Sequence, residues 1–101
     1  GNSGPSVKAP NQQVLPGSSK QIGQKYGEHM DNARPGYRSP QEYRDLANRL
    51  YSDPTASRTV YSPKAPNYPG ETHILDSAGN LLRLDSFGNF RSLYPIFSVK
   101  P

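Results

Sequence analysis

Apolar residues recur at helical spacing in two stretches of the first half of the chain. A first helix is predicted from about Ser19 to Met30, where a narrow apolar stripe repeats every four residues: Ile22, Tyr26 and Met30. Ser18 or Ser19 suits its N-cap, because a short hydroxyl side chain accepts from a free backbone N–H. Two glycines inside the stretch weaken it by roughly 1 kcal/mol each, so this helix needs support from tertiary packing.

The second predicted helix has clear start and stop signals. Ser39-Pro40-Gln41-Glu42 is a capping box with proline at the first helical position. Apolar residues then follow the pattern of one helical face: Tyr43, Leu46, Ala47, Leu50 and Tyr51. Asp53-Pro54 ends the helix, because the residue before a proline avoids helical backbone angles.

Beyond this point the pattern has a period of two, which predicts strands. Residues 57–62 form one strand, residues 63–70 a proline-rich loop, and three short strands follow near 71–76, 80–85 and 89–95. The turns form an internal repeat, because Asp76-Ser77-Ala78-Gly79-Asn80 returns nine residues later as Asp85-Ser86-Phe87-Gly88-Asn89. Such residues tolerate the positive φ angles of hairpin turns. The predicted fold is α+β, with two N-terminal helices and a three- to four-stranded antiparallel meander.

A register for the meander sorts its side chains into two faces. If both turns close alike, Leu75 faces Leu81, and Leu84 faces Phe90. The helix-covered face then carries Thr72, Ile74, Leu82, Leu84, Phe90, Ser92 and Tyr94. The opposite face carries a row of His73, Arg83 and Arg91, beside Leu75, Leu81 and Leu93.

Composition narrows the class of protein. The 101 residues suit one domain, for which we expect a flexible linker over residues 1–17 and a folded domain over residues 18–101. Hydrophobic residues make up only 32%, with nine Gly and eleven Pro, which predicts a thin core and many turns. Twelve Lys and Arg against eight Asp and Glu give a net charge of +4, which attracts polyanions weakly. No signal peptide and no apolar run of membrane-spanning length is present.

A metal site is not expected. There is no cysteine, so disulfides and cysteine-rich zinc sites are excluded. Zinc needs at least three ligands, and only His29, His73 and scattered acidic residues are available. The chain also has no glycine-rich phosphate loop.

Two groups of residues could instead cleave RNA without a metal. Lys25 and His29 are four residues apart, so they share one side of the first helix. Histidine can move protons near neutral pH, and a cation or a hydroxyl can hold the phosphate. The second group is the row of His73, Arg83 and Arg91, which suits anion binding. Both groups also have a purely structural interpretation. His29 can be a packed histidine beside a solvated Lys25, and the second group can be a solvated sheet face.

Short motifs resemble one family. Residues 25–30 (KYGEHM) resemble the Lys/His helix of colicin D-like toxin domains, and residues 82–85 (LRLD) with 88–95 (GNFRSLYP) resemble their closing hairpin. The broader group is the barnase/EndoU/colicin/RelE-like ribonuclease fold, and the likeness covers about residues 20–96. It departs from the family pattern in two ways. His29 lies four residues from Lys25 rather than three, and Tyr94 stands where Trp or Phe is frequent.

The resemblance implies residue roles. His29 would be the general base or acid, Lys25 the charge stabiliser, and Ser92 and Tyr94 the phosphate and nucleotide contacts. Barnase-like members instead work on the open sheet face, which would make His73 and Arg83 catalytic. Further RNA contacts are expected at Arg91, Lys20 and Thr72.

The same resemblance implies a biological setting. The domain would be a toxin of contact-dependent growth inhibition or another polymorphic toxin system, a monomeric endoribonuclease that cuts RNA, often tRNA, with no metal or cofactor. A larger carrier protein on its N-terminal side would export it from the producing bacterium, and it would act in the cytoplasm of the target cell. An acidic immunity protein would neutralise it. The alternatives are a non-catalytic RNA- or protein-binding module and a DNA nuclease, which normally uses a metal and a carboxylate cluster.

Overall fold

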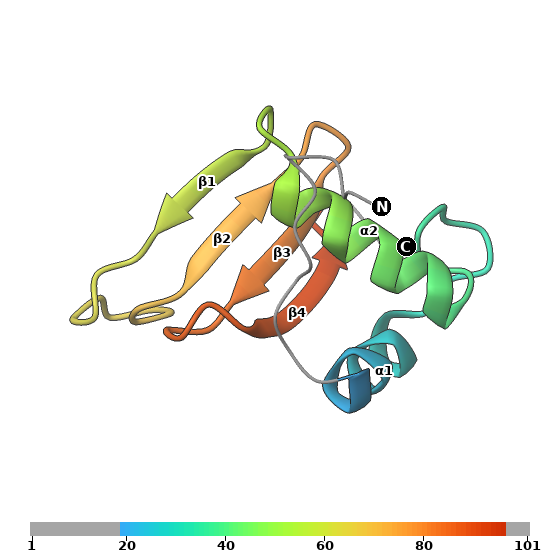
Figure 1. Ribbon diagram of the computed structural model, residues 1–101, viewed down its shortest axis with the longest axis horizontal. Coiled ribbons are helices and arrows are strands. Elements are labelled where there is room, and N and C mark those ends of the chain that lie inside the picture. The colour runs from blue at the N-terminus through green and yellow to red at the C-terminus, as the bar shows by residue number, and fades with distance from the viewer. Residues whose placement is uncertain (1–18, 97–101) are drawn as a thin grey trace, which may run out of the picture.

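The computed structural model describes residues 19–96, which form two helices and one four-stranded antiparallel sheet (Figure 1). The elements in chain order are α1 (Ser19–His29), α2 (Pro40–Ser52), β1 (Ser57–Val60), β2 (Thr72–Leu75), β3 (Asn80–Leu84) and β4 (Phe90–Pro95). Each strand pairs with its neighbour in sequence, in the order β1-β2-β3-β4. The predicted α+β class, with two helices before a meander, is confirmed. The predicted linker, residues 1–17, lies outside the described residues.

The start of α2 combines the predicted cap with an unexpected contact. The Ser39 hydroxyl accepts from the backbone N–H of Glu42 at 3.2 Å, and Pro40 is the first helical residue. The Glu42 carboxylate accepts from the backbone N–H of Gly36 at 3.0 Å, so it ties the preceding loop to the helix. Gly36 has φ +93°, and a Cβ there would lie 2.6 Å from Leu46. The loop can therefore approach α2 only with glycine at this position.

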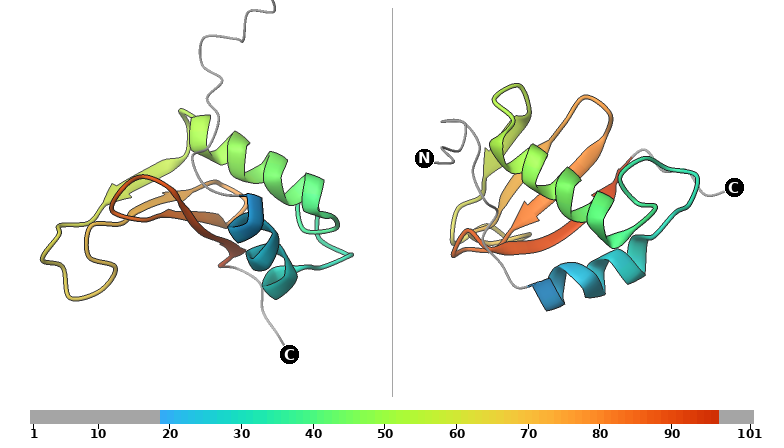
Figure 2. Two further views of the ribbon diagram at one scale, coloured as in Figure 1. Left: turned by 60° about the horizontal axis from the view of Figure 1, so that its bottom comes forward. Right: turned by 45° about the vertical axis from the view of Figure 1, so that its right-hand side comes forward.

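The hydrophobic core lies between α2 and one face of the sheet. Figure 2 shows α2 across that face and α1 along β4. The core consists of Ile22, Tyr37, Tyr43, Leu46, Ala47, Leu50, Ile74, Leu82, Leu84, Phe90 and Leu93. The predicted stripe on α1 is only partly correct, because Ile22 is buried and Tyr26 half-buried but Met30 is 55% exposed, one residue beyond the helix end. Among residues 19–96, no helix has the length and apolar character needed to cross a membrane.

The two glycines of α1 offer a direct stability test. Gly23 and Gly27 are exposed, and a Cβ added at either would meet no atom within 4 Å. We expect Gly23→Ala and Gly27→Ala each to raise the free energy of unfolding by about 0.5–1 kcal/mol, because alanine loses less backbone entropy in a helix. Urea denaturation followed by circular dichroism measures this. Gly36→Ala is the matched control and should destabilise, so stabilisation by all three would contradict the described backbone.

The meander keeps the predicted turns, but a β-bulge changes one strand. Leu75 pairs with Leu81 and Leu84 with Phe90, as predicted. The register then shifts, so that Arg83 pairs with Ser92 and Arg91 is the extra residue.

The bulge corrects the predicted faces of β4. Ser92 and Tyr94 were expected on the helix-covered face, but they pair with Arg83 and Leu81 of the other face. Leu93 pairs with buried Leu82 and is itself fully buried, so its predicted place on the open face is wrong. One extra residue reverses the alternation because successive side chains in a strand point to opposite faces.

Candidate functional site

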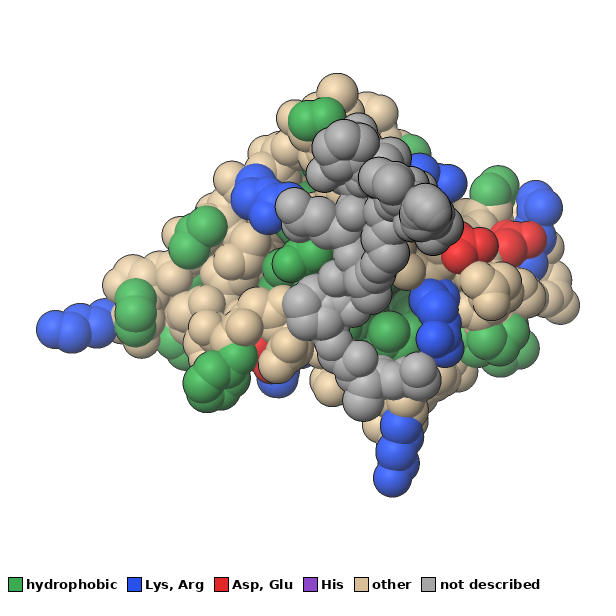
Figure 3. Space-filling model, in the orientation of Figure 1, with side chains coloured by type: hydrophobic (Ala, Val, Ile, Leu, Met, Phe, Trp, Pro, Cys, Tyr) green, Lys and Arg blue, Asp and Glu red, His purple; other side chains and the backbone are tan. Residues whose placement is uncertain are grey.

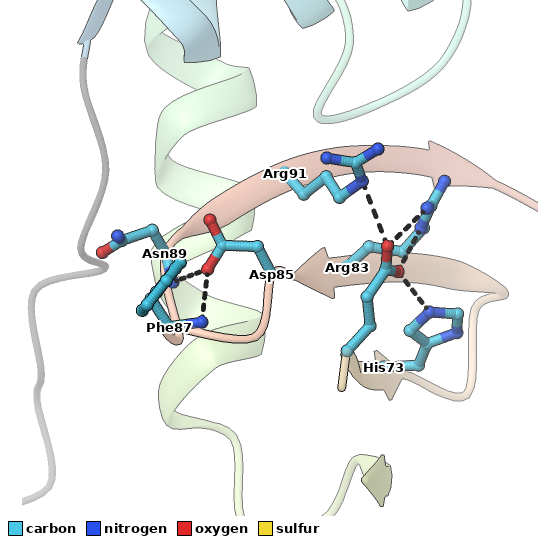
Figure 4. Close-up of polar contacts among 7 residues, drawn as sticks. His73, Arg83, Asp85, Phe87, Asn89 and Arg91 are labelled. Atoms are coloured by element: carbon cyan, nitrogen blue, oxygen red, sulfur yellow. Dashed lines mark hydrogen bonds and ion pairs between the residues drawn. The ribbon is translucent and has the colours of Figure 1, made fainter. Parts of the chain in front are cut away.

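A buried carboxylate lies on the sheet face that α2 does not cover. Glu71 immediately precedes β2, and its side chain is only 9% exposed. Glu71 Oε1 accepts from His73 Nε2 at 2.9 Å and from Arg83 Nε at 3.0 Å. Its Oε2 accepts from Arg83 Nη2 at 3.0 Å and pairs with Arg91 Nε at 3.1 Å. Figure 4 shows the three side chains converging on this one carboxylate from neighbouring strands.

Charge interactions keep this carboxylate ionised. Burial alone would raise the pKa of Glu71, but hydrogen bonds from Arg83 and His73 and the charges of Arg83 and Arg91 outweigh it. The pKa of Glu71 therefore lies below its usual range. The carboxylate in turn raises the pKa of Arg83, to which Tyr94 also contributes. These four side chains, Glu71, His73, Arg83 and Arg91, form the Glu71 group, in which one carboxylate faces two arginine cations.

Two tyrosines from the β1–β2 connection pack over His73. The rings of Tyr61 and Tyr68 have centroids 4.7 and 4.6 Å from the His73 ring, and 5.6 Å from each other. The Arg83 guanidinium carbon lies 4.7 Å from the centre of the Tyr68 ring. This contact is within the range of cation–π attraction. The His73 ring is therefore fixed by ring contacts with the two loop tyrosines and by its hydrogen bond to Glu71.

The bulge brings the two predicted centres together. Ser92 and Tyr94 lie on the same face as Arg83, and the ring centroids of Tyr94 and His29 are 5.5 Å apart. The predicted register placed Ser92 and Tyr94, the expected partners of His29, on the face opposite His73, and this placement is wrong. His29 and the residues around Glu71 border one surface, here called the polar surface, where Tyr94 contacts the His29 ring and lies near Arg83.

The helical part of this surface differs from its expected geometry. Lys25 Nζ contacts a carboxylate oxygen of Glu28 at 3.3 Å, so its charge is partly neutralised within α1. Burial lowers the pKa of His29, with the Lys25 charge acting in the same direction and Glu28 opposing it. The lowered pKa disfavours the protonated form of His29, and it makes that form a stronger proton donor where it is present.

Two predicted RNA contacts lie away from the Glu71 group. Thr72 pairs with Val60 and Leu84, which places it on the face toward the helices. Lys20 is exposed in the first turn of α1. The residue missed by sequence reasoning is Glu71. The alternation of side chains along a strand could have identified it. A residue two positions before His73 lies on the same side of the sheet, beside the two arginines.

On the visible and described part of the helix-covered face, the Lys and Arg side chains are scattered (Figure 3). Within residues 19–96, no three His, Cys, Asp or Glu side chains lie together as metal ligands would. Comparison of the chain with protein-family models, with curated proteins and with solved structures finds no match.

Proposed function

We propose that this domain is a metal-independent endoribonuclease whose centre is the Glu71 group on the open sheet face. The observation that carries the proposal is a carboxylate, 9% exposed, that is hydrogen-bonded to Arg83 and His73 and ion-paired with Arg91. RNA can be cut by its own 2′-hydroxyl, and this reaction needs a base, an acid and positive charge around the phosphate. All three are present on one surface.

The reaction can be assigned to the residues as follows. The ribose 2′-oxygen attacks the phosphorus, and its proton passes to the Glu71 carboxylate. Arg83 and Arg91 stabilise the negative charge that develops on the phosphate oxygens. The bond from phosphorus to the 5′-oxygen breaks, and that oxygen receives a proton from a histidine. The products are a 2′,3′-cyclic phosphate and a free 5′-hydroxyl.

Arg91 is the contact that substrate can displace. Its side chain is 52% exposed and it contacts Glu71 through one nitrogen, whereas Arg83 makes two contacts and is 17% exposed. If Arg91 turns to the substrate phosphate, Oε2 of Glu71 keeps its hydrogen bond from Arg83 and gains one acceptor position for the 2′-hydroxyl. Sharing the arginine charge with the phosphate also raises the pKa of Glu71, which makes it a better base.

The general acid is best sought at His29. Attack and departure occur on opposite sides of the phosphorus, so base and acid must lie on opposite sides of the phosphate. His73 is bonded to Glu71 itself and so lies on the base's side. His29 contacts Tyr94 at the far border of the polar surface. In this arrangement His73 is a positioning residue for Glu71.

The biological role as an exported toxin domain, with tRNA as substrate and an acidic immunity protein as partner, is also proposed. It rests on the sequence resemblance, together with the net charge of +4. A second candidate function is RNA binding without cleavage. The observation that favours it is that three hydrogen bonds and the Arg91 ion pair already occupy both carboxylate oxygens of Glu71.

One assay separates these functions. The domain is incubated with total tRNA in EDTA, and the ends of the fragments are analysed. We expect 2′,3′-cyclic phosphate ends, strong loss of cleavage with His29→Ala, and no cleavage of 2′-O-methyl RNA. Arg91→Ala should cut far more slowly than Arg49→Ala, which removes the same charge from the exposed side of α2. Intact tRNA that still binds the domain would rule out the nuclease and support the binding module.

A further inference from the structure

We propose that Tyr68 is the stacking platform for an unpaired nucleobase, which makes single-stranded or looped RNA the substrate class of this site. The inference deepens the proposed function, and it depends on that function for the placement of the phosphate at Arg83 and Arg91. It adds a binding site that neither the sequence motifs nor the Glu71 group assigns.

The first argument is how Tyr68 is held. The Arg83 guanidinium carbon lies 4.7 Å from the centre of the Tyr68 ring, and the rings of Tyr61 and His73 pack against it. The residue is nevertheless 41% exposed. The aromatic ring is thus held by three protein side chains while much of the residue remains accessible to solvent, as a preformed stacking surface requires.

The second argument is the backbone at this position. Among residues 19–96, Tyr68 is the non-glycine residue with positive φ, at +55°. This region is unfavourable for a side chain with a Cβ, and such residues cluster at ligand sites. The Tyr68 carbonyl also accepts from the Glu71 N–H at 3.0 Å. The loop that presents the ring is therefore joined directly to the residue that bears the carboxylate.

The third argument is the position of the ring relative to the cations. Arg83 contacts both Tyr68 and Glu71, so the ring lies beside the proposed phosphate position. Tyr94 also lies close to Arg83. Two aromatic rings therefore neighbour the same cation, which suits the two bases and the phosphate of one dinucleotide step. A base stacked on Tyr68 must leave its own stack, so a continuous duplex does not fit this arrangement.

Binding to a fluorescent single-stranded 2′-O-methyl RNA, which cannot be cleaved through its 2′-oxygen, tests the inference without requiring activity. Tyr68→Gly removes the ring and suits the positive φ, so the loop backbone is preserved. We expect it to weaken binding about 5- to 150-fold, the range found for loss of one stacked base. Tyr68→Phe keeps the ring and should bind as the wild type does. Phe87→Ala, which removes the exposed ring of the β3–β4 turn, is the matched control and should also bind normally.

The outcomes separate this proposal from the function on which it rests. Wild-type affinity in Tyr68→Gly, with the fold verified by circular dichroism, overturns the stacking site. If Tyr68→Gly weakens binding of a matched duplex as much as binding of the single strand, the substrate class is overturned. Failure of the wild type to bind the single strand also overturns it. Tyr68-dependent binding together with intact tRNA in the EDTA assay overturns the nuclease and leaves the base site standing. If Tyr68→Gly changes neither cleavage nor binding, the base site is overturned and the nuclease stands.

Discussion

Replacing Glu71 with glutamine is expected to lower the rate of RNA cleavage by at least about 100-fold, the lower end of the range for loss of a general base. Glutamine has nearly the same shape, but its amide cannot accept the 2′-hydroxyl proton at neutral pH. Single-turnover cleavage of a short RNA in EDTA measures the effect on the chemical step.

Stability must be measured alongside this rate, because the glutamine also removes the anion between Arg83 and Arg91. Removing one partner of a buried ion pair lowers the free energy of unfolding by about 3 kcal/mol. Rates are therefore compared at a temperature where circular dichroism shows both proteins folded. Asp45→Asn makes the same change from carboxylate to amide on the exposed side of α2 and should leave the rate unaltered. A Glu71→Gln protein that cuts within a few-fold of the wild-type rate would exclude Glu71 as the base.

Tyr43→Ala is expected to produce the largest loss of stability, about 4 kcal/mol. Tyr43 is fully buried in α2, and three aromatic rings lie around it with centroids 5.7–6.2 Å away: Tyr26, Tyr37 and Phe90. Its hydroxyl donates to the Leu93 carbonyl at 2.6 Å. Alanine leaves a cavity and removes that hydrogen bond. Because ordinary domains are stable by only about 5–15 kcal/mol, much of the population should be unfolded at 37 °C.

Urea denaturation followed by circular dichroism measures this loss. Tyr43→Phe keeps the ring packing and removes only the hydroxyl, so it should cost about 1 kcal/mol, the usual worth of one hydrogen bond. Phe87→Ala, at an exposed turn, should fall within about 0.5 kcal/mol of the wild type. A cost below about 1 kcal/mol for Tyr43→Ala would contradict the described core.

The elements of this fold were predictable because their signals are local. The Ser39 cap, the apolar face of α2 and the two Asp-Ser-x-Gly-Asn turns each act within a few residues of the chain. The turns also determine the pairing of Leu75 with Leu81 and of Leu84 with Phe90. The end of α1 was less predictable, because the apolar Met30 lies outside the helix and remains exposed.

The faces of β4 could not be derived from alternation alone. A regular strand places Phe90 and Ser92 on one face, but Phe90 and Leu93 are both fully buried. Two large apolar residues three positions apart cannot face the same core without an irregularity, so this spacing was the available sign of a bulge. Because the bulge was not anticipated, Ser92 and Tyr94 were assigned to the wrong face.

The composition of the candidate site was predictable in part. The row of His73, Arg83 and Arg91 follows from the register and is present in the structure. Glu71 was not included, because it precedes the strand and its burial results from three partners that only the folded sheet brings together. The contact of His29 with Tyr94 likewise depends on the docking of α1 beside β4, which no local pattern encodes.

The sheet order has a consequence for how this molecule acquires its structure. Every strand pairs with its neighbour in sequence, so no pairing has to wait for a distant part of the chain. Glu71, His73, Arg83 and Arg91 lie within twenty-one consecutive residues, counting both ends. Closing short segments costs little chain entropy, and topologies of short sequence separation fold quickly. We therefore expect rapid refolding after complete unfolding, with the Glu71 group forming as β2, β3 and β4 pair in succession.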